Sequence, residues 1–98
     1  MTKQQFISTE ILCVQYNIEF SFLDALTKIG LITIEVIEQH HYIHQAHIGD
    51  LEKMIRLHNE LNVNPEGIDV VFNLLEKEME LRKELDALKN RLRLYESD

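Results

Sequence analysis

The fold is decided by residues 64–95, whose sequence is NPEGIDVVFNLLEKEMELRKELDALKNRLRLY. Asn64 is a good helix N-cap, and Pro65 suits the first helical position, where its missing N–H costs nothing. No second Pro follows before Tyr95, and Gly67 lies in the first turn. The stretch therefore predicts one long helix, of which about 25 residues at about 1.5 Å each would make a rod of roughly 37 Å.

Apolar residues recur along this helix in alternating steps of three and four, with Glu78 as the one polar residue in the series. The mean step of about 3.5 residues is the heptad spacing of a coiled coil. Because a rod this long overhangs a small domain, we predict a homodimer and leave the pairing sense open. A helix packed along its own domain is the alternative. The predicted seam consists of Val71, Leu74, Leu81, Leu85, Leu88, Leu92 and Tyr95.

The length of 98 residues indicates one domain with an extension rather than two domains. We assign residues 1–63 to the domain and residues 64–98 to the C-terminal helix, in one continuous structural unit. The longest apolar run is shorter than the roughly 18 residues that span a membrane, and the first residues do not resemble a signal peptide. The single cysteine, Cys13, has apolar neighbours, which indicates a buried thiol. We therefore expect a cytoplasmic protein without a membrane segment.

Two short helices are predicted at the start of the domain. The first covers residues 6–17, and Ile11, Leu12 and Val14 give it an apolar side. Its candidate caps are Ser8 and Thr9. Ser21, with Asp24 three residues later, resembles a capping box that opens the second helix, and Gly30 is well placed to end it. The buried face of the second helix is expected to consist of Phe22, Leu23, Leu26 and Ile29. Two such helices joined by a tight turn predict a helix-turn-helix.

A strand pair and a third helix are predicted next. Residues 32–36 alternate between apolar and other side chains, and Tyr42 with Ile43 could form the returning strand around a polar tip at residues 38–41. A strand pair after a helix-turn-helix is the outline of a wing. The third helix is expected from about Ile48 to Leu61, with an apolar side of Ile48, Leu51, Met54, Ile55 and Leu61. The fold class is therefore mainly α-helical: a winged helix-turn-helix with a small β wing and a long C-terminal coiled-coil helix.

The charge of the chain argues against a DNA-binding surface. The net charge is −7, and residues 1–50 carry only Lys3 and Lys28 as basic groups against six acidic ones. A DNA-binding surface needs clustered Lys and Arg to displace counterions from phosphates. The predicted helix-turn-helix and wing instead present acidic residues at four positions where a DNA-binding protein would present Arg and Lys, which we interpret as a surface that binds a basic protein. These partner-binding candidates are Glu19, Asp24, Glu35 and Glu38.

Four histidines lie within eight residues: His40, His41, His44 and His47. On a strand His40 and His44 would share a face, so a metal site is one interpretation. No cysteine is near, and four ligands from one hairpin would be unusual, so we favour solvated wing histidines. We expect no metal and no cofactor, and we expect His58 on the third helix at a packing edge.

Catalysis has little support in the sequence. Ser8 and Cys13 are possible nucleophiles, but no recognisable spacing pairs either with a base. The chain also has no Gly-rich phosphate loop. We therefore predict that the protein is not an enzyme.

Residues 55–71, IRLHNELNVNPEGIDVV, resemble the core signature of the CbpM family of small bacterial chaperone modulators. The order of elements also fits nearly the whole chain, and it resembles MerR-type winged-helix regulators, to which CbpM looks related. The residues that fall where the CbpM pattern places them are Arg56, Leu57, Glu60, Leu61, Gly67, Ile68 and Leu74.

The resemblance implies a function that composition and periodicity do not. CbpM-like proteins bind the J-domain of a DnaJ-like co-chaperone of the CbpA type and inhibit it, so we expect that partner here. The alternative is a MerR-like DNA-binding transcriptional regulator with the same fold. MerR regulators carry Arg and Tyr in the second helix and wing, whereas residues 21–26 read SFLDAL, without Arg. This difference favours the chaperone modulator.

Overall fold

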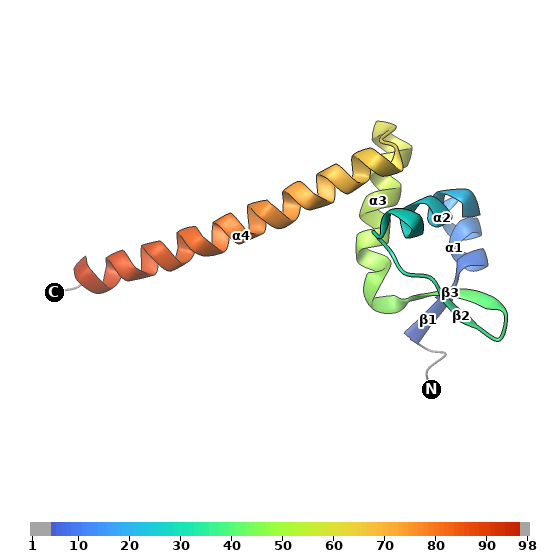
Figure 1. Ribbon diagram of the computed structural model, residues 1–98, viewed down its shortest axis with the longest axis horizontal. Helices are drawn as coiled ribbons and strands as arrows, with labels where there is room; N and C mark the ends of the chain where they lie inside the picture. Colours follow the sequence, from blue (N-terminus) through green and yellow to red (C-terminus); the bar gives the residue numbers. More distant parts are fainter. Residues whose placement is uncertain (1–4, 97–98) are drawn as a thin grey trace.

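The computed structural model describes residues 5–96, in which a small antiparallel sheet lies at one end of a group of short helices and one long helix leaves the domain (Figure 1). This architecture confirms the predicted fold class, a mainly helical winged helix-turn-helix with a long C-terminal helix. The elements in order are β1 (Phe6–Ser8), α1 (Thr9–Tyr16), α2 (Phe20–Ile29), β2 (Glu35–Ile37), β3 (His40–His44), the 3₁₀ turn η2 (Gln45–His47), α3 (Ile48–Leu61) and α4 (Pro65–Glu96).

The first helix is shorter than predicted, because its expected first residues form β1. The strand pairs with β3 in the register Ile7↔Ile43, which makes the sheet three-stranded in the order β1-β3-β2. Ser8 is the N-cap of α1, and its Oγ accepts a hydrogen bond from the Glu10 N–H at 3.2 Å. Asn17 ends the helix in the left-handed conformation with φ 54°.

The predicted capping box of α2 is wrong, whereas the predicted end of the helix is confirmed. The helix begins one residue before Ser21, and the Ser21 hydroxyl donates to the Glu19 carboxylate at 3.3 Å instead of capping the helix. Gly30 follows the last turn with φ 97°, and its N–H bonds the carbonyls of Leu26 and Thr27. A positive φ of this size favours glycine.

The wing is a tight hairpin of β2 and β3. Its two turn residues, Glu38 and Gln39, both have positive φ, 51° and 67°, as a type I′ hairpin turn requires. The strands are displaced from the prediction, since β2 begins at Glu35 and β3 already at His40. The polar tip is therefore a two-residue turn, and the histidines that follow it belong to β3.

The core is formed where α1, α2, α3, the sheet and the first turn of α4 meet. Phe22, Leu23 and Leu26 are buried as predicted, and Ile29 is half-buried. Leu61, expected on the apolar side of α3, is 68% exposed, so that prediction is wrong. It lies six residues after Ile55, about 240° further around the helix axis. The buried apolar residues are Leu12, Phe22, Leu23, Leu26, Ile32, Ile43, Leu51, Met54, Ile55 and Ile68.

The corner between α3 and α4 is built from short local contacts. Asn62 ends α3 with φ 60°, and the Val63 carbonyl accepts a hydrogen bond from the His58 ring at 3.1 Å when that nitrogen carries the proton. The Asn64 side chain accepts from the Gly67 N–H at 2.8 Å, which confirms Asn64 as the cap of α4. A Cβ on Gly67 would lie 2.7 Å from Val63 Cγ1, so this position has no room for a side chain.

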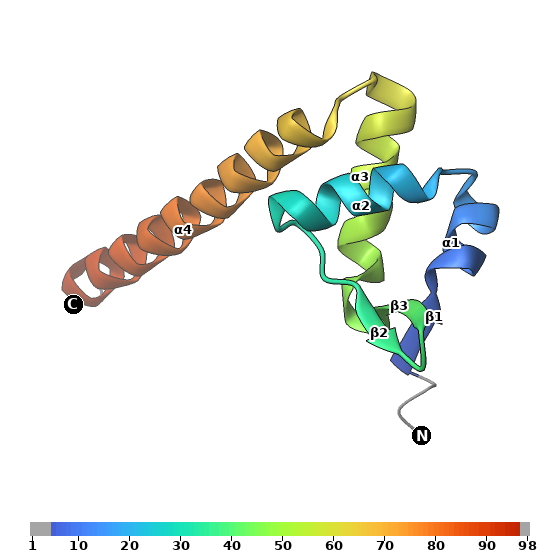
Figure 2. The same cartoon turned by 45° about the vertical axis from the view of Figure 1, so that its right-hand side comes forward.

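Helix α4 comprises 32 residues and is about 48 Å long at about 1.5 Å per residue. Both views show it leaving the domain at the end of α3, on the side away from α1 and the wing (Figures 1 and 2). Ile68 is buried and Phe72 is half-buried against the domain, but every residue from 73 to 96 is exposed. The alternative in which this helix packs along its own domain is therefore wrong. No helix in the described part of the chain could span a membrane.

Candidate functional site

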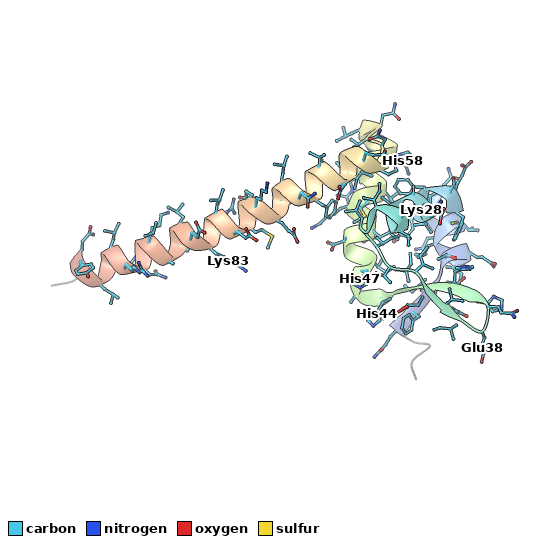
Figure 3. The ribbon with its side chains drawn as sticks, in the orientation of Figure 1. Lys28, Glu38, His44, His47, His58 and Lys83 are labelled. Carbon is cyan, nitrogen blue, oxygen red and sulfur yellow. The ribbon has the colours of Figure 1, made fainter. Side chains whose placement is uncertain are left out.

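The four acidic candidates do not form one cluster. Glu19, directly before α2, and Glu38, in the wing turn, are both exposed, and Figure 3 shows Glu38 at the tip of the wing. Asp24 is half-buried, and its Oδ2 lies 3.1 Å from the Lys28 Nζ one turn further along α2. Glu35 pairs with Tyr42, one register step from the pair of Val36 with His41, so Glu35 lies on the opposite face of the sheet from His41.

The basic groups near these carboxylates are few. Between residues 5 and 52 the sequence contains Lys28 and no other Lys or Arg. Lys28 is ion-paired with Asp24, so one of the four carboxylates has its charge offset within the domain. The i, i+4 spacing of this pair is readable from the sequence. Glu19, Glu35 and Glu38 remain as exposed charges that can attract a cationic partner, and of these Glu35 lies on the opposite face of the sheet from His41.

The histidines of the wing lie on both faces of the sheet. His40 and His44 share the outer face, where the His44 ring packs edge-on against Phe6 with centroids 5.1 Å apart. The His44 Nδ1 also accepts from the Ala46 N–H at 3.0 Å, so that nitrogen is already engaged. His41 lies on the inner face, 5.6 Å from the Phe20 ring. Within residues 5–96 no three His, Cys, Asp or Glu side chains are arranged to hold a metal ion.

His58 has a packing role, as expected. Its ring stacks on Phe22 with centroids 4.4 Å apart and an interplanar angle of 23°. The ring nitrogen near the Val63 carbonyl ties the same side chain to the loop before α4. His58 thus connects α2, α3 and the start of the long helix.

The two candidate nucleophiles are not activated. The Ser8 hydroxyl is the cap of α1. Cys13 is half-buried rather than buried, and its partial burial raises the pKa of the thiol. A raised pKa disfavours the thiolate, which is the nucleophilic form of cysteine.

One side-chain hydrogen bond joins the helix-turn-helix to α3. The Tyr16 hydroxyl donates to the Glu52 Oε2 at 2.7 Å. This hydrogen bond, with smaller contributions from desolvation and from the charge of Glu52, raises the pKa of Tyr16. The bond links the last residue of α1 to α3, and no sequence spacing indicates it because its partners are 36 residues apart.

The predicted seam is an exposed apolar stripe in the single chain. Val71, at its start, is half-buried, and the exposed fractions of Leu85 and Leu88 are 50% and 54%. Ile68 and Phe72, one helical turn apart, pack against the domain. The side of α4 that contacts the domain is therefore different from the side that carries the predicted seam. The homodimer itself stays a prediction.

Residues 7–90 match the family model described as MerR HTH family regulatory protein. The matched range runs from β1 through most of α4 and so includes the helix-turn-helix, the wing and most of the seam. No match was found among curated proteins or among solved structures.

Proposed function

Since the chain belongs to the MerR HTH regulatory protein family, we propose that it uses this fold to bind a protein instead of DNA. In this proposal it is a non-enzymatic chaperone modulator that binds and inhibits the J-domain of a DnaJ/CbpA-like co-chaperone. The resemblance of residues 55–71 to the CbpM signature supports this partner.

The observation that carries the proposal is the shortage of cations on the helix-turn-helix and wing. Duplex DNA presents a phosphate about every 1.7 Å of its axis, and affinity comes largely from Lys and Arg that displace counterions. Glu19 and Glu38 are exposed here, and Lys28 is ion-paired with Asp24. Such a surface repels a phosphate backbone and attracts a basic protein helix. In the families that this chain resembles, the second helix of the J-domain is typically basic.

In this proposal the protein acts as a homodimer that pairs through the α4 seam. The seam runs along the part of α4 that extends beyond the domain (Figure 1), and the wing lies on the opposite side of the molecule. Pairing of two copies through the α4 seam does not itself use the residues of the wing. One dimer can then bind two J-domains without steric competition at the seam.

A paired titration tests the proposal. The same protein sample is titrated with the J-domain encoded in its own genome and with duplex DNA, at about 0.05 M and at about 0.3 M salt. We expect J-domain binding that weakens as salt rises, because ionic screening shortens the reach of charges. Micromolar or tighter DNA binding at physiological salt, together with no J-domain binding, would overturn the proposal and establish a DNA-binding regulator.

A charge-reversal variant tests which surface is responsible. Glu38→Lys should slow association more than it speeds dissociation, because peripheral charges steer encounter more than they hold the complex. Glu80→Lys is the matched control, since Glu80 is also an exposed glutamate but lies on α4. Equal association rates for both variants would show that the wing does not face the partner.

A further inference from the structure

Four large apolar side chains of the helix-turn-helix and wing are exposed. The exposed fractions are 58% for Ile11, 84% for Val14, 43% for Phe20 and 63% for Val36. Ile11, Leu12 and Val14 are the predicted apolar side of the first helix, but of these three only Leu12 is buried. Single exposed apolar residues are ordinary, whereas a contiguous group indicates an interaction site.

These side chains are contiguous. Val14 and Phe20 line one hollow of about 530 Å³ together with His41, Cys13, Thr9 and Glu10. Ile11 and Val14 line an adjoining hollow with Glu10. His41 packs against Phe20 and is the cross-strand partner of Val36, so the apolar surface continues from α1 across the start of α2 to the wing. We call Ile11, Val14, Phe20, Val36 and His41 the α1–wing surface.

One carboxylate lies in this surface, and two others are close to its residues in the chain. Glu10 lines both hollows, and Glu19 directly precedes Phe20 in the chain. Glu38 follows Val36 by two residues, in the hairpin turn. No Lys or Arg occurs in the sequence between residues 5 and 27, which include α1, the turn and most of α2. An apolar centre with carboxylates nearby is complementary to an apolar side chain flanked by cations.

From this arrangement we infer that the α1–wing surface binds an amphipathic helix of a partner protein, one that presents a row of apolar side chains flanked by Lys or Arg. The inference rests on the proposed function and specifies where and how the partner is held. Exposed ion pairs contribute about 0–1 kcal/mol each, so the carboxylates alone cannot hold a complex. Val14 and Phe20 supply the apolar contact that the carboxylates lack, and the carboxylates select a cationic helix.

Charge also excludes two other occupants. A second copy of the α1–wing surface would bring two acidic surfaces together, and like charges in contact repel. Duplex DNA would meet the same carboxylates with phosphates and would leave the apolar residues without a partner. A basic amphipathic helix satisfies both the charge and the apolar area.

Cys13 gives a direct measure of occupancy. It lines the hollow beside Val14 and Phe20, and it is the single cysteine of the chain, so alkylation is unambiguous. The rate of alkylation by iodoacetamide is followed by mass spectrometry with two probes. One is the J-domain from the same genome, and the other is a synthetic helix of about 18 Leu and Lys residues in amphipathic order, with its scrambled sequence as control.

We expect both probes, but not the scrambled peptide, to slow alkylation of Cys13. Val14→Ser should weaken both complexes by about fivefold to tenfold, since it removes apolar contact from the centre of the surface. Leu94→Ser is the matched control, because Leu94 is 78% exposed and lies near the far end of α4, outside residues 55–71 and outside the predicted seam. It should change neither affinity. Val14 is 84% exposed, so Val14→Ser should keep its thermal midpoint.

The outcomes separate the two proposals. Normal J-domain binding that neither slows alkylation nor responds to Val14→Ser would overturn the α1–wing surface and leave the proposed function standing. Peptide binding that depends on Val14, with no J-domain binding, would support the surface and overturn the proposed function. Unchanged alkylation with both probes would overturn the inference.

Discussion

Replacement of Leu85 by Asp tests whether α4 joins two copies of the chain. Leu85 is 50% exposed in the single chain. Burial of a whole Leu contributes about 1.5–3 kcal/mol, so pairing gains about 1 kcal/mol from each copy and about 2 kcal/mol from both. Loss of this amount raises the dissociation constant about 30-fold. Two carboxylates on one seam add desolvation and repulsion, so about 30-fold is the minimum expected change.

The measurement is the molecular mass over a range of protein concentrations, by sedimentation velocity or light scattering. Ala87→Asp is the control, because it adds the same charge two residues further along α4, about 200° around the axis and away from the seam. We expect a dimer for the unmutated chain and for Ala87→Asp, and a monomer for Leu85→Asp at the same concentration. A monomeric mass for the unmutated protein at tens of micromolar would refute the reasoning.

Three further predictions concern stability, measured by denaturant unfolding at one fixed protein concentration because a dimer unfolds in a concentration-dependent way. Tyr16→Phe should cost less than about 1 kcal/mol, since water competes for the exposed bond to Glu52. That bond raises the pKa of Tyr16, so its contribution to folding stability is present below the ordinary tyrosine pKa of about 10 and is lost as the pH rises through the pKa of Tyr16 in the folded protein. An equal difference in unfolding free energy between the unmutated protein and Tyr16→Phe at pH 8 and at pH 11.5 would contradict this. Gly67→Ala should destabilise by about 1–2 kcal/mol, because the new Cβ would lie 2.7 Å from Val63 Cγ1, and a stabilised variant would show that the corner can relax. Asn64→Ala should lower the free energy of unfolding by about 1 kcal/mol, because the helix cap is lost. Asn64→Asp should keep most of the capping stabilisation, because Asp is also a good N-cap. Equal losses of stability in the two variants would argue against capping.

The sequence predicted the two longest helices, α3 and α4, best. Helix α3 has the expected bounds, and α4 begins after Asn64 as predicted, because caps and a helical apolar period are local signals. Strand β1 was missed, since it is three residues long and pairs with a strand 36 residues away. The capping box of Ser21 was wrong because α2 begins at Phe20, with Glu19 at the N-cap position, so Ser21 lies inside the first turn.

The surroundings of the acidic candidates follow only in part from the sequence, and their role in binding stays a prediction. Glu19 and Glu38 are exposed as a partner surface requires, whereas Asp24 is ion-paired and Glu35 lies on the opposite face of the sheet from His41. The apolar centre could not be predicted, because the composition of α1 does not reveal how the helix is rotated against the core. Phe20 gave no signal for the same reason, since its exposure depends on the contact with His41 in a strand 21 residues away.

The corner at Val63 and Gly67 has a mechanical consequence. Helix α4 acts as a lever about 48 Å long, so a rotation of about 10° at the corner moves its far end by about 8 Å. The close approach of Gly67 to Val63, the Asn64 cap and the His58 ring stacked on Phe22 all limit that rotation. In a dimer a rotation at both corners would change the angle between the two domains by twice that amount. Local packing over a few residues therefore sets the distance and relative orientation at which the two copies present their wings.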